Sequence, residues 1–208
     1  ISLLVSKMFL AKIPQELHFM RKIVIDGSNT SGFQRTAIVG INGKLETSKG
    51  TIGITNISLE EESCQILETR EKETVFGLDR LGIPLVEIGT APDIISPEHA
   101  KETAEKIGML LKSTGKVMRG IGTIRQDVNV SIKGHPRVEI KGFQEVKMFV
   151  PTIEKEIERQ QVDKNGKSEV RKANPDGTTD FLRPMPGSAR MYPETDLPLL
   201  KISRDEIN

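Results

Sequence analysis

Sulfur and aromatic rings are scarce in this sequence, and both shortages restrict the class of protein. The single cysteine, Cys64, cannot form an intramolecular disulfide, which excludes a disulfide-stapled scaffold and fits a reducing compartment. Aromatic residues make up 4% of the chain and tryptophan is absent. The core therefore depends on isoleucine, leucine, valine and methionine.

Net charge and long apolar runs are also missing. The 208 residues include 30 basic and 29 acidic side chains, a formal net charge of +1. Any contact with nucleic acid must therefore come from local patches rather than from bulk attraction. No apolar run reaches the length of a membrane span, and residues 1–7 lack the basic region of a signal peptide. We expect a cytoplasmic protein without a membrane partner.

One stretch, residues 122–132, alternates apolar and polar side chains, which is typical of a half-buried strand. The run 137–141 repeats the alternation, and residues 133–136 between them have turn chemistry. The pattern predicts an antiparallel hairpin with Val128, Val130, Val138 and Ile140 packed behind. Its polar face would carry Arg125, Asp127, Asn129, Glu139 and Lys141.

Two interpretations of this polar face are open. From the pattern alone, a solvated face with cross-strand ion pairs is preferred. The mixture of both charges with an amide also suits a phosphorylated, metal-linked ligand.

Carboxylates occur at two further places with strand character. The run Glu60, Glu61 and Glu62 follows strand-like residues, and we expect it to begin a helix capped by Ser58, because negative charge suits a helix N-terminus. The alternative is that one of these acids ligates a hard cation. Glu87 lies inside an apolar strand pattern at 83–88, where it must face solvent, a cation or an arginine.

The helices and loops are predicted from caps and breakers. Apolar spacing predicts a helix over 3–13 that Pro14 ends, a helix that Ser96 caps, and a third over 151–161. His99, in the first turn of the second helix, is expected at the surface. The loop 26–32 is rich in Gly, Ser, Asn and Thr, and an ordinary connection is preferred there over a phosphate cradle. The Pro-flanked segment 190–196 is either a surface loop or a lining of a binding site.

Several blocks resemble one family in the family's own order. They are RKIVIDGSNTSGFQRT (21–36), LDRLGIPLVEIGTAPDI (78–94), STGKVMRGIGTIRQDVNVSIKG (113–134), VEIKGFQE (138–145), ANPDGTTDFLRP (173–184) and ARMYPETDLP (189–198). The chain resembles the GatB/GatE family, which comprises the B and E subunits of glutamyl-tRNA(Gln) amidotransferases. The blocks GFQRT and GIGTIRQDVN favour the archaeal E branch, because they stand where the B type has other residues.

The resemblance implies an α+β fold, a mostly antiparallel mixed sheet with flanking helices that forms a cradle related to glutamine synthetase. It also implies an amidotransferase with ATP and Mg²⁺ as cofactors. Glu-tRNA(Gln) would be phosphorylated on its side-chain carboxylate, and ammonia would then displace phosphate to give Gln-tRNA(Gln). An asparaginase-like, ammonia-producing D subunit would be the partner, in a heterotetramer.

The resemblance also assigns roles to residues. Glu61 and Glu87 match the metal-ligating glutamates. Arg125, Asp127, Asn129, Glu139 and Lys141 would line the catalytic site, with Arg125 stabilising phosphate charge and Asp127 a candidate for deprotonating the attacking amine. The nucleotide would be bound by Ser28, Asn29, Arg125, Arg190 and Tyr192.

Departures from the family pattern lead us to expect an incomplete cradle over residues 1–208. The family's N-terminal segment, which supplies a Glu and a His to the metal, has no counterpart, and His18 is not that histidine. An inserted domain resembling part of aspartyl-tRNA synthetase is absent near 161–170, as are the C-terminal helical and tail domains. A fragment of this kind leaves an alternative open, a non-catalytic scaffold that binds tRNA or a partner protein.

Overall fold

The structure of the chain is a computed structural model that describes residues 1–120, 122–163, 165–187 and 190–207. The chain divides into two compact units, and each is described by itself. The first comprises 1–46, 51–93 and the described part of 188–208, and the second comprises 47–50 and 94–187. The fold is α+β with mostly antiparallel strand pairs, as expected. The relation to glutamine synthetase stays a prediction.

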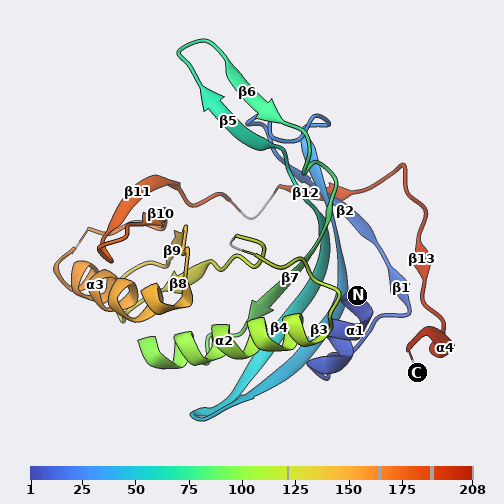
Figure 1. Cartoon of the computed structure of the whole chain (residues 1–208), viewed down its shortest axis with the longest axis horizontal. Coiled ribbons are helices and arrows are strands. Elements are labelled where there is room, and N and C mark those ends of the chain that lie inside the picture. The colour runs from blue at the N-terminus through green and yellow to red at the C-terminus, as the bar shows by residue number, and fades with distance from the viewer. Residues whose placement is uncertain (121, 164, 188–189, 208) are drawn as a thin grey trace. The chain divides into compact units, whose positions relative to one another are not determined.

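The first unit is built on a five-stranded sheet in the order β12-β2-β3-β4-β7, with the long strands β3 and β4 side by side (Figure 1). Strand β2 pairs antiparallel with β12 and β3, and β7 pairs antiparallel with β4. Two small pairs, β1 with β13 and β5 with β6, complete the strands of the unit. The bounds are β1 Glu16–Leu17, β2 Phe19–Ile23, β3 Phe33–Thr47, β4 Gly50–Glu61, β5 Gln65–Thr69, β6 Thr74–Gly77, β7 Pro84–Thr90, β12 Met191–Pro193 and β13 Leu200–Lys201.

Helix α1 (Ser2–Met8) packs closely against β3. A Cβ added at Gly40 would lie 2.6 Å from Ser6 Oγ, so only glycine permits this approach. The helix ends at Met8, because Leu10 takes a left-handed conformation with φ of 54°. The prediction that it runs to Pro14 is therefore wrong. The short helix α4 (Arg204–Ile207) lies at the other end of this unit's chain.

The acidic run at 60–62 does not begin a helix. Strand β4 continues through Glu61, which pairs with Pro84 of β7. Ser58 is opposite Glu87 in this ladder and caps nothing. Pairing with β7 and burial of Ile57 keep the segment extended, and these tertiary effects override the local signal of a cap followed by acids.

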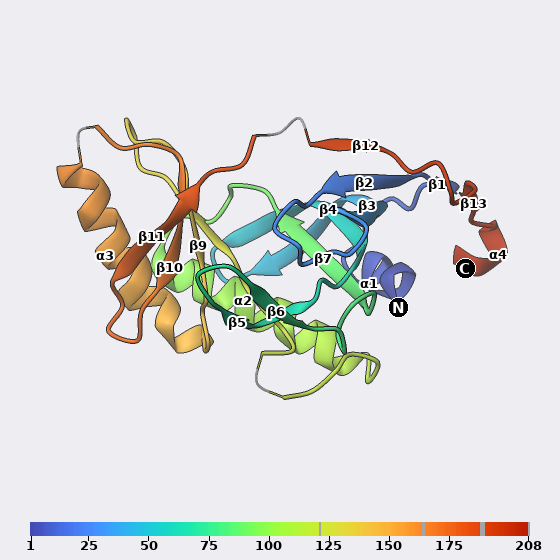
Figure 2. The same cartoon turned by 90° about the horizontal axis from the view of Figure 1, so that it is seen from above.

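The second unit holds a four-stranded sheet in the order β11-β10-β9-β8. Strands β8 and β9 form the predicted antiparallel pair, whereas β10 runs parallel to β9 and antiparallel to β11. Strands β10 and β11 were not predicted, because the polar residues 164–168 and the prolines at 184 and 186 do not give the sequence pattern of a strand. Figure 2 shows helix α3 beside β10 and β11. The bounds are α2 Pro97–Ser113, β8 Val128–Val130, β9 Val138–Lys141, the 3₁₀ turn Val146–Met148, α3 Phe149–Val162, β10 Glu169–Ala173 and β11 Thr179–Pro184.

The apolar side of the hairpin is buried as predicted. Val138 and Ile140 have no exposed surface, and with Val130 they form a core with Phe149 and Ile153 of α3. The strand begins only at Val128, so the predicted strand over 122–127 is wrong. Gly120 and Gly122, which precede this point, have positive φ, a conformation that an extended strand does not contain.

Helix α2 begins as predicted, with the Ser96 side chain accepting a hydrogen bond from the His99 backbone N–H. The prediction of a surface His99 is wrong, since the residue is 1% exposed. Its Nδ1 accepts from Ile95 N–H, and its Nε2 lies 2.8 Å from Thr47 Oγ1. The ring is buried because the tip of the β3–β4 hairpin, residues 47–50, packs on the start of α2.

Candidate functional site

The polar face of the β8–β9 hairpin carries a compact charged cluster. Lys141 Nζ lies 2.8 Å from a Glu139 carboxylate oxygen and also donates a hydrogen bond to Asp127 Oδ2. Asn129 is the direct cross-strand partner of Glu139. Four of the five predicted catalytic residues are therefore neighbours within one unit.

Lys141 is held as a cation in this cluster. Burial lowers its pKa, but the carboxylates of Asp127 and Glu139 more than offset the burial, so the pKa of Lys141 lies above its ordinary value. Two carboxylates and one ammonium give the cluster a net charge of −1, which favours a further cation. The cluster can therefore bind an amine or a metal-bound ligand on chemical grounds.

Arg125, the fifth predicted catalytic residue, is exposed in the irregular segment before β8. It lies outside the strand, so its side chain is not fixed by the alternation that orients its neighbours. The prediction that Arg125 stabilises phosphate stays a prediction.

The predicted metal ligands Glu61 and Glu87 lie on adjacent strands of the first unit. Glu87 is opposite Ser58, three residues before Glu61. Because side chains alternate along a strand, Glu60 shares the face of Glu87, and Glu61 lies on the other face.

Hydrogen bonds agree with this alternation. Glu60 accepts from Lys22 Nζ at 2.9 Å and from Gln34 Nε2 at 3.2 Å, and Lys22 and Gln34 are themselves cross-strand partners. Glu61 accepts from the Arg35 backbone N–H at 2.9 Å, with its other oxygen 3.6 Å from the Arg35 guanidinium. The Glu61 and Glu87 side chains therefore lie on opposite faces of the sheet.

Among the described residues, no three His, Cys, Asp or Glu side chains converge as a metal site. A hard cation such as Mg²⁺ takes several oxygen ligands, including water. The carboxylates on β4 and β7 supply oxygens of the right chemistry but do not by themselves form a complete set. The assignment of Glu61 and Glu87 as ligands stays a prediction.

The loop before β3 is held by its own side chains. Asp26 Oδ1 accepts from both the backbone N–H and the hydroxyl of Ser28, and Asn29 Oδ1 accepts from Ser63 Oγ at 2.7 Å. Ser28 and Asn29, predicted to bind nucleotide, are 8% and 4% exposed. Their carbonyl oxygens are also engaged, since Ser28 O accepts from Cys64 N–H at 2.7 Å and Asn29 O accepts from Gly32 N–H at 2.9 Å. Their role in nucleotide binding stays a prediction.

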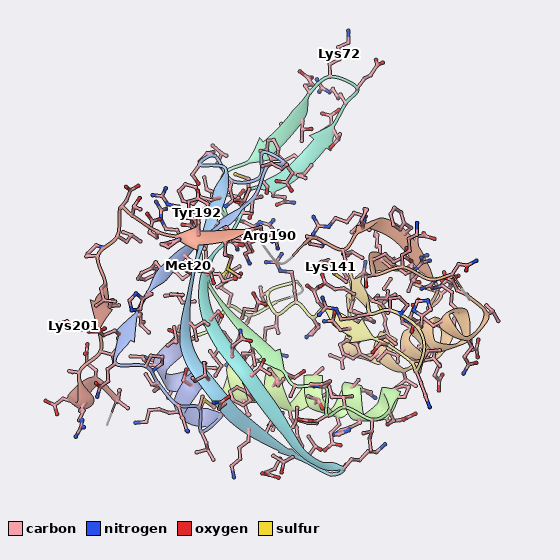
Figure 3. All side chains as sticks on the ribbon, turned by 180° about the vertical axis from the view of Figure 1, so that it is seen from behind. Met20, Lys72, Lys141, Arg190, Tyr192 and Lys201 are labelled. Carbon is pink, nitrogen blue, oxygen red and sulfur yellow. The ribbon has the colours of Figure 1, made fainter. Side chains whose placement is uncertain are left out.

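The segment that follows the second unit returns to the first unit's sheet as β12. Tyr192 is the cross-strand partner of Arg21, and Arg190 O accepts from Ile23 N–H. Figure 3 shows Arg190, Tyr192 and Met20 close together at this pair of strands. Of the predicted nucleotide ligands, Tyr192 thus lies on the edge strand β12, where it is 38% exposed, and Arg190 immediately precedes that strand.

One residue of this segment received no role from its sequence pattern. The Glu194 side chain has no exposed surface and bridges the guanidinium groups of Arg21 and Arg35. The only sequence signal was the gathering of Arg, Tyr, Glu and Asp in a Pro-flanked segment. Its arginine partners are more than 150 residues away, so local patterns could not pair them.

No helix of the described residues is long and apolar enough to cross a membrane.

Comparisons with known proteins place these residues in a family. The model of the GatB/GatE catalytic domain matches residues 1–208. The chain is 59% identical over 160 residues to the E subunit of glutamyl-tRNA(Gln) amidotransferase from Thermococcus gammatolerans, covering 77% of this chain and 26% of the relative. It is 62% identical over 145 residues to the E subunit from Thermococcus sibiricus, covering 70% and 23%.

A third relative extends the similarity to another archaeal group. The E subunit from Methanosarcina acetivorans is 59% identical over 160 residues, which cover 77% of this chain and 25% of the relative. The chain thus spans about a quarter of the length of the relatives it matches. With the match over all of its residues, the chain belongs to the GatB/GatE catalytic domain family.

Proposed function

We propose that the chain is the catalytic cradle of an amidotransferase that converts Glu-tRNA(Gln) to Gln-tRNA(Gln). The observation that carries the proposal is the identity of 59% and more to relatives named as the E subunit of glutamyl-tRNA(Gln) amidotransferase. The chemistry of the described residues supports it, because carboxylates, an ammonium group and an arginine are what carboxylate activation requires.

The proposed reaction has two steps. The side-chain carboxylate of the tRNA-bound glutamate attacks the γ-phosphorus of ATP, and ADP leaves. Ammonia then attacks the resulting acyl phosphate, phosphate leaves, and the amine loses a proton. Arg125 stabilises charge on the phosphoryl group, and Asp127 accepts the proton that the amine must lose.

The other polar side chains of the β8–β9 hairpin would orient Asp127 for this reaction. Lys141 orients the Asp127 and Glu139 carboxylates and balances one of their two charges, and Asn129 lies opposite Glu139. Arg190 and Tyr192 bind the nucleotide beside the loop of Ser28 and Asn29. Mg²⁺ would neutralise charge on the nucleotide phosphates. Glu61 and Glu87 lie on opposite faces of the sheet, so each would be a ligand of a separate ion. Ammonia would come from a separate asparaginase-like D subunit in a heterotetramer in the cytoplasm.

The test uses the full-length protein assembled with its ammonia-producing partner. ATP-dependent formation of Gln-tRNA(Gln) is measured against Mg²⁺ concentration for wild type, Glu61→Gln and Glu87→Gln. Both variants should need about tenfold more Mg²⁺, because each loses one charged ligand.

Glu60→Gln is the matched control, since Glu60 neighbours Glu61 but pairs with Lys22 and Gln34. A shift with Glu60→Gln and Glu87→Gln but not with Glu61→Gln would move the metal to the face that Glu60 and Glu87 share. If the wild-type protein binds Glu-tRNA(Gln) but forms no product under any condition, the result favours the non-catalytic scaffold over the enzyme.

A further inference from the structure

A buried carboxylate on the first unit's sheet has no role in the proposed reaction. Glu194 lies just after β12, and its side chain is fully buried. One oxygen lies 2.5 Å from Arg21 Nη2, and the other lies 2.6 Å from Arg35 Nε. The first oxygen also accepts from the backbone N–H of Asp196 at 2.7 Å. One side chain thus fixes two arginines and the turn that follows the strand.

The two arginines need an anion between them. Arg21 and Arg35 are directly opposite in the β2–β3 ladder, where like charges repel. Hydrogen bonds from Arg21, and more weakly from Arg35, lower the pKa of Glu194 to about 2, although burial opposes this. Glu194 is therefore ionised at neutral pH and offsets the repulsion.

Arg21 in turn contacts the aromatic side chains of this face. Its guanidinium carbon lies 4.4 Å from the centre of the Phe33 ring and 5.9 Å from the centre of the Tyr192 ring. The two rings meet edge to face at 6.4 Å. Tyr192 is the cross-strand partner of Arg21, so the position of the arginine decides where the tyrosine ring rests.

Anchoring of the backbone completes the arrangement. The Glu194 N–H donates to Phe19 O, and the Ile23 N–H donates to Arg190 O, so β12 is tied to β2 at both ends. Because β12 is an edge strand of only three residues, these ties and the Glu194 bridge decide how firmly it is held.

We propose that Glu194 is a positioning residue for the nucleotide: it holds Arg21 and thereby fixes Tyr192 and the edge strand that presents Arg190. The proposal rests on the proposed function, which places ATP beside Arg190 and Tyr192. Glu194 itself touches no substrate, since its carboxylate is enclosed by the two guanidinium groups and the Asp196 N–H.

Glu194→Gln tests the proposal in the full-length protein with its partner. The amide keeps the shape and loses the charge, so Arg21 and Arg35 repel and Tyr192 loses its fixed support. Binding of a non-hydrolysable ATP analogue, measured by calorimetry, should weaken about tenfold, the effect of losing one charge-assisted hydrogen bond. The KM for ATP should rise by a similar factor, with kcat changed less.

Glu68→Gln is the control. Glu68 is bound by both Arg70 Nε and Arg70 Nη2 but is half exposed on β5, so the same chemical change should leave ATP binding within twofold of wild type. If Glu194→Gln does not fold, Arg21→Lys is tested instead. Lysine keeps the positive charge but lacks the planar guanidinium that bonds Glu194 and lies over the Phe33 ring. Unchanged ATP affinity in the folded variant, even with a lower melting temperature, would reduce Glu194 to a structural role.

A second comparison separates the two proposals. Tyr192→Ala should weaken binding of the analogue on its own if ATP lies where the proposed function places it. An effect of Tyr192→Ala without an effect of Glu194→Gln would refute the positioning role alone. If Tyr192→Ala has no effect, the nucleotide does not bind beside this strand, and the positioning proposal is refuted as well.

Discussion

Glu156 shows how a single charged residue organises the second unit. Its side chain on α3 has no exposed surface, and it accepts hydrogen bonds from Arg159, Gln160 and Thr179, with Arg171 within 3.8 Å. Gln160 also lies within hydrogen-bond distance of the backbone of β8 and of Ile132. The carboxylate therefore links the helix to β10, β11 and the hairpin that carries the candidate site.

Replacing Glu156 with glutamine should destabilise the protein by about 2–3 kcal/mol at neutral pH. Breaking a buried ion pair costs about 3–5 kcal/mol, and the cost is smaller here because Arg159 is about a quarter exposed. Burial raises the pKa of Glu156, but the hydrogen bonds from Arg159 and Gln160 outweigh the burial, so the pKa lies below its ordinary value of 4.5. The stabilisation is therefore present above pH 4.5 and is lost as the pH falls below it.

Urea unfolding of the two proteins from pH 7 down to pH 3 measures both effects. The difference in free energy of unfolding should be largest at pH 7 and shrink toward acid pH. Glu158→Gln, two residues along the same helix but exposed, should change stability by less than about 0.5 kcal/mol. Equal losses for both variants would show that the buried network contributes nothing of its own.

At the residue scale, the sequence predicted apolar burial far better than polar burial. Alternation alone marked Val138 and Ile140 as buried residues, because apolar periodicity is a local property. It did not mark Glu156, whose burial depends on Arg171 of β10 and Thr179 of β11 as well as on Arg159 of its own helix. Glu194 escaped notice for the same reason.

Among the described elements, the β5–β6 hairpin stands out because few of its residues are packed against the rest of the chain. All five residues of β5 are exposed, and of the four residues of β6 two are exposed and two are half-buried. Near its base the Phe76 ring lies against Gly27, where an added Cβ would be 3.0 Å from the ring and where φ is +85°. A two-stranded hairpin without a covered face is marginally stable in water.

Hydrogen exchange measured by mass spectrometry should therefore show the β5–β6 amides exchanging orders of magnitude faster than those of β3 and β4. Local opening of the hairpin exposes little apolar surface, so it costs far less than global unfolding. Strand β4 is the internal control, because Ile52, Ile54 and Ile57 on it are fully or almost fully buried. Protection of β5 equal to that of β4 would mean that the hairpin is covered in solution.

At the scale of elements, prediction succeeded where pattern and pairing are local. The hairpin of β8 and β9 and the Ser96-capped helix were confirmed, because alternation, turn chemistry and a cap lie within a few residues of each other. The continuation of β4 through Glu61 and the parallel pairing of β10 with β9 were not foreseen. Both depend on partners distant in the chain, which no local signal encodes.

At the scale of the whole chain, the second unit is nearly continuous in sequence. Apart from residues 47–50, it comprises residues 94–187. Its core, which includes Val138, Ile140, Phe149 and Ile153, draws all its buried residues from that range. A polypeptide with its own core can fold alone.

We therefore expect a polypeptide of residues 94–187 to fold without the rest of the chain. It lacks Thr47 and Ser48, so the contacts of His99 and Glu102 with the hairpin tip are lost and the start of α2 should fray. The nuclear magnetic resonance spectrum should be well dispersed, with cooperative thermal unfolding, and Ile140→Ala should lower the melting temperature as a sign of a packed core. A collapsed state without fixed side-chain signals would instead show that this core needs the remaining residues, because packing within 94–187 would then be too weak to offset the loss of chain entropy.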